Sequence, residues 1–220
     1  MSSRIIIRGM RLILSAILGA ATVAAGQSYP PPFPRPGAVK MLENPRVQVW
    51  NVEWPKGQTT ALHRHPYDMT GTYYAPGDRL ITAVDGSKRP VSTKAGGIIW
   101  QRTGLTHIEE GTSDAPLRAV MIELKQDGPE KQVDHSSNVT AFAGDGGMPT
   151  LDNDRVTVWS YTRALRADSP THRHTLDAVV VWMDGATPHA AFVARGTSHA
   201  EETIGSAIRA TIFEDRKSVV

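Results

Sequence analysis

The hydrophobic positions of this chain fall in short runs that alternate with polar residues and end at turn residues. The run from 47 to 54 alternates and stops at Pro55-Lys-Gly57, and the run from 117 to 124 alternates in the same way. The run from 80 to 84 ends at Asp85-Gly86, a pair typical of a β-hairpin turn. Evenly spaced short strands separated by Gly, Pro and Asp predict an all-β sandwich or barrel.

A second pattern lies over this alternation, because the second half of the chain repeats motifs of the first. Asn44-Pro-Arg-Val47-Gln-Val-Trp50 matches Asn153-Asp-Arg-Val156-Thr-Val-Trp159. In each copy a His-Arg-His motif begins 13 positions after the tryptophan, and a third histidine follows later. A repeat of this length indicates two copies of one structural unit in one chain.

Each unit carries three histidines at matched positions: His63, His65 and His107 in the first, and His172, His174 and His199 in the second. Residues i and i+2 of a strand face the same side, so both histidines of each His-Arg-His motif can point to one place. A tight turn at Gly104 would bring the third histidine of the first unit to the same place. Three imidazoles are typical ligands of a transition metal and leave coordination positions for water or substrate. The pattern therefore predicts a metal site in each unit and favours catalysis there.

The repeat divides the chain into five segments. We predict a signal peptide at 1–26, a Pro-rich arm at 27–40, a first domain at 41–125, a linker at 126–150 and a shorter second domain at 151–220. The second domain is shorter because 42 positions separate His65 from His107, whereas 25 separate His174 from His199. The difference of 17 predicts that the hairpin between the metal motifs is trimmed in the second unit.

The N-terminal segment has the order of a secretory signal peptide. Arg4, Arg8 and Arg11 precede an apolar run at 12–25, and small residues end it. The alternative is a membrane anchor, but the run is short for a full span and no charged stop-transfer segment follows it. We expect a periplasmic or secreted mature protein that begins near Gly26 and has no stable membrane span after processing.

Composition narrows the ligands and partners. The chain has no cysteine, so disulfides and thiolate ligands are excluded and a metal must be held by His, Asp or Glu. Of the formal charge of +2, residues 1–26 supply three arginines and no acid, so the rest of the chain is close to neutral. No basic stripe indicates nucleic-acid binding. We expect a small-molecule substrate or ligand as partner, and a homodimer is compatible with the sequence.

The spacing around the histidines resembles the metal-binding motifs of the cupin superfamily. Gly57, five residues and His63-x-His65 are similar to the first motif, and Gly96, five residues and Arg102-x-Gly104-x-x-His107 are similar to the second. His172-x-His174 and Arg195-Gly196-x-x-His199 resemble the same motifs. Over residues 41–220 the chain thus resembles a bicupin, and within that superfamily it most resembles the metal-dependent dioxygenase-type cupins. The resemblance implies an all-β chain with two double-stranded β-helix (jelly-roll, cupin) domains.

The chain departs from the family pattern after the second histidine. Cupin sites usually add a glutamate four or five positions later, where this chain has Met69 and Thr70 in the first unit and apolar residues in the second. Asp68 and Asp177 stand three positions after the second histidine of each unit. Alternation faces both away from the metal, so we interpret them as carboxylates that brace the turn and pair with an arginine. A β-bulge would turn them inward, and ligation is the alternative.

Other side chains are candidates for chemistry beside the metal. Glu109 and Glu201 lie two positions past the third histidine of their units, so alternation places them on the metal-facing side. We expect Glu109 to act as a fourth ligand or general base, and Glu201 to occupy the matching place in the second unit. Tyr67 is a second candidate for proton handling, with packing as the alternative.

Three functions are compatible with this site. The first is a dioxygenase-type oxidoreductase that uses Fe(II) to act on a small organic substrate, with Zn, Mn, Ni or Cu as the other metals that the ligands would accept. The second is a non-catalytic periplasmic cupin that binds a metal or small ligand. The third is a lyase or isomerase that uses Zn or Mn as a Lewis acid.

Overall fold

The structure is a computed structural model that describes residues 28–125, 149–164, 172–199 and 207–218. These residues form β-strands and one short 3-10 turn at Arg216–Ser218, which confirms the predicted all-β fold class. The predicted signal peptide, Glu201 and most of the predicted linker lie outside the described residues. None of the described segments forms a helix of the length and apolarity needed to cross a membrane.

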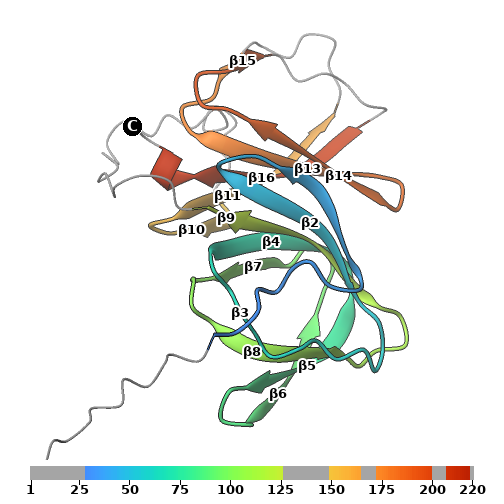
Figure 1. The fold of residues 1–220 in the computed structure, drawn as a ribbon. Helices are drawn as coiled ribbons and strands as arrows, with labels where there is room; N and C mark the ends of the chain where they lie inside the picture. Colours follow the sequence, from blue (N-terminus) through green and yellow to red (C-terminus); the bar gives the residue numbers. More distant parts are fainter. Residues whose placement is uncertain (1–27, 126–148, 165–171, 200–206, 219–220) are drawn as a thin grey trace, which may run out of the picture.

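The first unit is a double-stranded β-helix built from two antiparallel sheets that face each other (Figure 1). The larger sheet has the order β1 (Ala38–Glu43), β2 (Val47–Trp54), β9 (Leu117–Leu124), β4 (Asp68–Ala75) and β7 (Ile98–Gln101). The smaller sheet has the order β3 (His63–Arg64), β8 (Thr106–Gly111), β5 (Gly77–Ala83) and β6 (Lys88–Thr93). Pro90 lies on β6, an edge strand of this sheet, where a missing N–H costs little.

The second unit repeats this plan with a reduced second sheet. Its larger sheet has the order β10 (Leu151–Asp152), β11 (Val156–Ala164), β16 (Ala207–Asp215), β13 (Asp177–Asp184) and β14 (Thr187–Val193). Its smaller sheet contains only β12 (His172–Arg173) and β15 (Ser198–His199) within the described residues.

The trimming predicted between the metal motifs is the loss of one hairpin. In the first unit the hairpin of β5 and β6 stands between β4 and β7. In the second unit β13 turns directly into β14 at Gly185, which adopts a φ of 57°. The turn at Gly185 therefore closes a different hairpin from the turn at Gly86, although the two sequences look alike.

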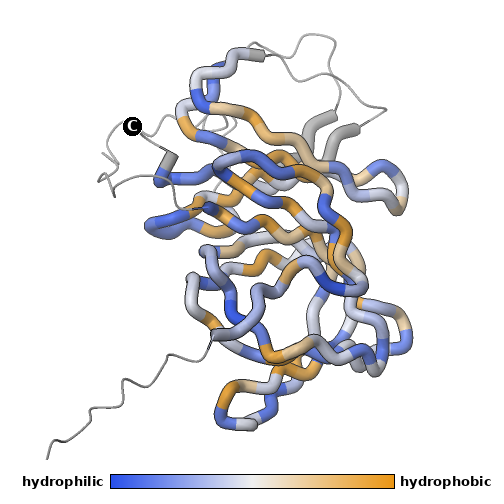
Figure 2. Tube along the Cα trace, viewed as in Figure 1, coloured by the Kyte–Doolittle hydropathy of each residue, from blue (hydrophilic) through white to orange (hydrophobic). Residues whose placement is uncertain are grey.

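The larger sheets of the two units pack against each other. On β2 the odd positions Val47 and Val49 face the second unit, whereas Trp50, Val52 and Trp54 face the interior of the first. Figure 2 shows apolar stretches on the facing strands. The shared core consists of Val47, Val49, Val120, Ile122 and Leu124 from the first unit and Val156, Val158, Val179, Val181 and Phe213 from the second. Each such side chain contributes about 1.5–3 kcal/mol when fully buried.

The Pro-rich arm packs across the first unit. The carbonyl of Pro30 accepts the N–H of Arg64 at 2.9 Å, and the ring of Phe33 stacks on Trp50 with centroids 5.0 Å apart. Arg35 lies 5.2 Å above the Trp54 ring. Strand β1 begins at Ala38, so the last residues of the predicted arm already belong to the sheet. The arm thus covers part of the wall behind the histidine motif.

Candidate metal centre

The three histidines of the first unit meet inside its β-helix. His63 on β3 pairs with His107 on β8, and His65 follows directly after β3. One ring nitrogen from each of the three lies within 4.8 Å of the others, and the side chains are only 3–4% exposed. The N–H of Gly104 donates to the carbonyl of His65 at 2.8 Å, and Gly104 adopts a φ of 90°, a conformation that favours glycine. The predicted convergence of these residues is what the structure shows.

The imidazole nitrogens have the arrangement that a metal ion requires. His63 Nδ1 lies 2.9 Å from the carbonyl oxygen of Ala61, so this nitrogen carries the proton and donates it, and Nε2 keeps a lone pair. The Nε2 atoms of His63 and His107 are buried and have no hydrogen-bond partner within the described part of the chain. Two orphaned nitrogens facing one point fit a bound cation, because an unsatisfied buried polar atom is otherwise costly.

The charge state of the histidines also suits a metal. Burial lowers the pKa of all three, and it lowers the pKa of His65 to about 3 with further help from the neighbouring His107 and His63. For His107 burial lowers the pKa to about 4, although Glu109 acts in the opposite direction. Neutral imidazoles are therefore present at ordinary pH, and this is the form that coordinates a metal.

Glu109 lies beside the cluster with both carboxylate oxygens already engaged. Its Oε2 accepts the indole N–H of Trp54 at 2.9 Å, and its Oε1 accepts an N–H of Arg79 at 2.7 Å. The same Oε1 is 3.8 Å from Nε2 of His107. Burial acts to raise the pKa of Glu109, but Arg79 and His107 outweigh it and lower that pKa. The structure thus places a fixed negative charge next to the histidines, outside the group of three.

Arg79 extends this contact into a buried network. It donates to the hydroxyl of Tyr73 at 2.5 Å and its side chain is only 5% exposed. Burial raises the pKa of Tyr73 to about 12, so the phenol stays protonated. Because β5 carries Arg79, β8 carries Glu109 and β4 carries Tyr73, the network ties the two sheets together behind the metal ligands.

Asp68 has the bracing role that alternation suggested. It is 3% exposed, and its Oδ1 accepts the backbone N–H of Thr103 at 2.9 Å. Its Oδ2 lies 3.3 Å from Nε of Arg155, which belongs to the second unit. The carboxylate therefore fixes the turn before His107 and pairs across the interface, away from the three-histidine cluster.

Asp177 mirrors this arrangement. Its Oδ1 accepts the backbone N–H of Arg195 at 2.8 Å, and its Oδ2 accepts Nε–H of Arg46 at 3.1 Å. Arg46 belongs to the first unit, so each unit supplies an arginine to the aspartate of the other. The two units are thus joined by exchanged ion pairs around an approximate twofold relation.

The other predicted site residues fall in two groups. Tyr67 is half-buried and lines a pocket beside the arm. In the second unit the backbones of His172 and His199 pair as those of His63 and His107 do, and His174 is 1% exposed. The side chains of His172 and His199, and all of Glu201, lie outside the described residues. The metal site predicted in the second unit therefore stays a prediction.

Sequence reasoning missed several residues that surround the cluster. Gln101 places its amide nitrogen 2.8 Å from Nδ1 of His65, and Trp54 and Arg79 hold Glu109. Glu123 accepts the indole N–H of Trp50 at 3.0 Å inside the β-helix. For Glu123 a signal existed: in the second unit Glu214 accepts the indole N–H of Trp159 at 2.8 Å, so the repeat carries a matched Trp–Glu pair.

Comparison with known proteins supports the fold. No family model and no curated protein matches the chain. The structure of AerE from Microcystis aeruginosa is similar to 85% of this chain over 98% of its own, with a TM-score of 0.54 and 9% identity. A cupin 2 conserved barrel domain protein from Leptotrichia buccalis matches 81% of this chain and 88% of its own, with a TM-score of 0.49 and 12% identity. A cupin domain from Bordetella pertussis Tohama I matches 43% and 99%, with a TM-score of 0.38 and 28% identity.

Proposed function

We propose that this protein is an exported bicupin that binds a divalent transition metal at His63, His65 and His107 and acts as an oxidoreductase of the dioxygenase type on a small organic substrate. Its neighbours among solved structures are cupin-domain proteins, and the fold is the double-stranded β-helix of that superfamily. The observation that carries the proposal is the buried group of three neutral imidazoles with two orphaned nitrogens.

The donor set favours an open site over a closed structural one. Three imidazoles would occupy three positions of a bound metal, and the carboxylate of Glu109 is already held by Arg79 and Trp54. Positions thus remain for substrate and a second small molecule. Fe(II) bound there would supply one-electron redox chemistry toward dioxygen, which the all-histidine set tolerates.

The remaining roles belong to the chain itself. Ala61 fixes the tautomer of His63, and Gln101 lies against the ring of His65, so both orient a ligand. Glu109 keeps a negative charge near His107 and offsets part of the metal's charge. Its pKa is lowered, so it is a poor proton donor at neutral pH. We assign it a positioning role. Tyr67, the other candidate for proton handling, lines the pocket beside the arm, and none of the three histidines lines that pocket.

Metal loading and small-molecule access test this proposal together. We expect the purified protein, loaded anaerobically with Fe(II), to bind nitric oxide and give the half-integer-spin resonance of an iron–nitrosyl with an open coordination position. His107→Ala should bind neither iron nor nitric oxide. A protein that takes up no divalent metal, or iron whose coordination excludes nitric oxide, would rule the proposal out.

The engagement of Glu109 also favours the second candidate, a cupin that binds a metal or small ligand without turnover. Within the described residues no carboxylate joins the three-histidine group, so an evident general base is lacking. Zinc that co-purifies at one equivalent and exchanges slowly, together with no oxygen uptake by the iron-loaded form, would favour this function over the first.

Export is proposed from the N-terminal sequence. The arginines at positions 4, 8 and 11 and the apolar run at 12–25 have the order that a secretion pathway recognises. Mass spectrometry of the protein from a bacterial host should find a mature chain beginning near Gly26 in the periplasmic or secreted fraction. An intact N-terminus in the membrane fraction would show an anchor instead.

A further inference from the structure

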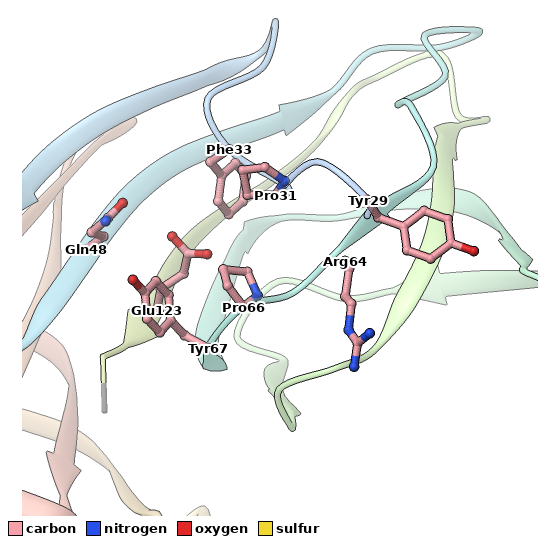
Figure 3. Close-up of a pocket in the computed structure, with 8 residues that line it drawn as sticks. All are labelled: Tyr29, Pro31, Phe33, Gln48, Arg64, Pro66, Tyr67 and Glu123. Carbon is pink, nitrogen blue, oxygen red and sulfur yellow. The ribbon is translucent and has the colours of Figure 1, made fainter. Parts of the chain in front are cut away.

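A pocket of about 410 Å³ opens beside the histidine motif of the first unit (Figure 3). None of the three clustered histidines lines it, but Arg64 and Pro66, the neighbours of His65, do. The Pro-rich arm forms one wall and strands β2 and β9 form another. The full lining is Tyr29, Pro31, Phe33, Gln48, Arg64, Pro66, Tyr67 and Glu123.

Glu123 is the buried charge of this pocket. Its side chain is 3% exposed, and its Oε2 accepts the indole N–H of Trp50 at 3.0 Å. Its Oε1 has no hydrogen-bond partner among the residues that the structure describes, and this oxygen is not fully buried. One carboxylate oxygen is therefore free to meet a ligand inside the pocket.

No ion pair of the described chain neutralises this carboxylate. The two lysines whose charge reaches it, Lys40 and Lys125, are both bound to Glu43, with the Lys125–Glu43 contact at 2.8 Å. Burial raises the pKa of Glu123 above its usual range, against the opposing effect of Trp50 and these lysines. A buried carboxylate in this state gains stability from a ligand that brings N–H donors and positive charge.

The second unit contains the same pair in a more enclosed setting. Glu214 accepts the indole N–H of Trp159 at 2.8 Å, as Glu123 does with Trp50. The other oxygen of Glu214 is sealed from solvent. The repeat therefore supplies an internal reference: the same carboxylate–indole pair is closed in the second unit and open to a cavity in the first.

The walls of the pocket suit the carbon skeleton of an amine. Phe33 and Tyr67 provide aromatic surface, and Pro31 and Pro66 provide apolar surface. Aromatic rings next to a carboxylate are a favourable environment for an ammonium group, since the ring faces attract cations. Figure 3 shows the guanidinium of Arg64 directed away from Glu123. Arg64 therefore leaves space beside the carboxylate for a cationic ligand.

We propose that this pocket binds a small organic cation, whose primary or secondary ammonium group donates to Oε1 of Glu123 while its apolar skeleton packs against Phe33, Tyr67 and the two prolines. The proposal goes beyond the metal site, and the two can fail separately. Binding here requires Glu123 and no metal ion.

Benzylamine is the probe that matches this chemistry, and benzyl alcohol is its uncharged counterpart. Titration at neutral pH is followed by nuclear magnetic resonance of the side chains and by the fluorescence of Trp50, which contacts Glu123. We expect saturable binding of benzylamine, and benzyl alcohol at least about tenfold weaker. Glu123→Gln keeps an oxygen for the Trp50 indole, so it should fold, and it should weaken benzylamine about tenfold or more.

Glu214→Gln is the matched control, because it makes the same change in the sealed pair. It should leave benzylamine affinity within about twofold of the unmodified protein. The double variant His63→Ala/His65→Ala should lose metal and still bind benzylamine, which separates this proposal from the metal function. Equal binding of amine and alcohol, undiminished binding by Glu123→Gln, no saturable binding up to millimolar benzylamine, or an equal loss in Glu214→Gln would overturn the proposal.

Discussion

The two units of this protein share strands, histidines and a Trp–Glu pair, yet within the described residues the smaller sheet has four strands in the first unit and two in the second. The hairpin of β5 and β6 is what the second unit lacks, and β5 carries Arg79. Within the described residues of the second unit, no strand stands in the place of the one that carries the arginine bound to Glu109 at 2.7 Å. The comparison teaches that a metal motif can be copied intact while the residues that fix its surroundings are lost with one hairpin.

The interface between the units also differs on its two sides, although the arginines and aspartates stand at matched positions. Arg155 is completely buried between Asp68 and Asp215, whereas Arg46, at the matching position, has a side chain 23% exposed beside Asp177. Asp215 pairs with Val156 in the second unit, and Leu124 pairs with the matched Val47 in the first. The second unit thus has an aspartate where the first has a leucine. Nη2 of Arg46 also lies 3.8 Å from Oδ2 of Asp215, so the two arginines belong to one network that is buried at Arg155 and partly exposed at Arg46.

The largest expected difference between the two units is in metal content when each His-Arg-His motif is removed in turn. His63→Ala/His65→Ala should empty the first metal site completely, because two of three ligands are gone. His172→Ala/His174→Ala should remove at most the metal of the second unit. Elemental analysis after reconstitution with one divalent metal reports both. Unchanged metal content in the first double variant would contradict the three-histidine site.

The next largest effect concerns the exchanged ion pairs. Arg155→Ala leaves Asp68 buried without its guanidinium and removes the closer of the two arginines beside Asp215, which should lower the free energy of unfolding by about 3–5 kcal/mol. Arg46→Ala removes a more exposed guanidinium, which contacts Asp177 at 3.1 Å and Asp215 at 3.8 Å, and should cost about 1 kcal/mol. Urea denaturation measures both. Similar losses in the two variants would show that burial at the interface does not differ as the structure indicates.

The third effect concerns the network that only the first unit has. Arg79→Met frees one oxygen of Glu109 and removes its charge partner, so the metal affinity of the first site should change by tenfold to about a hundredfold. Glu201→Gln, the carboxylate change in the unit without β5, should alter the metal affinity of its own site by less. Competition with a chromogenic chelator measures the affinities, and thermal melting checks that each variant is folded.

The smallest effect is a pH dependence of stability at the matched Trp–Glu pairs. Burial raises the pKa of Glu214 above its ordinary value of 4.5, so the folded protein favours the neutral acid more than the unfolded chain does. The stabilising contribution of a raised carboxyl pKa is present at low pH and declines as pH rises from about 4.5 through the folded value. Glu214→Gln removes this decline, so its stability relative to the unmodified protein should increase between acidic and neutral pH.

Glu123→Gln provides the comparison for that experiment. Its carboxylate also has a pKa raised by burial, but one oxygen opens to the pocket and the group loses less hydration. We expect the same sign and a smaller rise with pH than for Glu214→Gln. Unfolding free energies measured by urea denaturation at several pH values decide this, and a fall in relative stability with rising pH would refute the assignment.

The sequence by itself determined several of the strands and the histidines that converge at the candidate metal site. The predicted runs at 47–54 and 117–124 coincide with β2 and β9, since alternation there is a local property. Histidines two positions apart, followed by a glycine turn, converge because the geometry of a strand and a turn is also local. The convergence of His63, His65 and His107 therefore followed from spacing.

Only the tertiary structure decided which elements are buried on both faces and which charges meet. Strand β4 was not predicted, because Met69 and Tyr73 face the interior while Thr70 and Thr72 lie on the face toward the second unit, so no alternation marks it. The partners of Glu109 and Asp68 lie 30 and 87 positions away along the chain. Such pairs form only when sheets pack, because charge pairing depends on distance in space and leaves no periodic trace in the sequence.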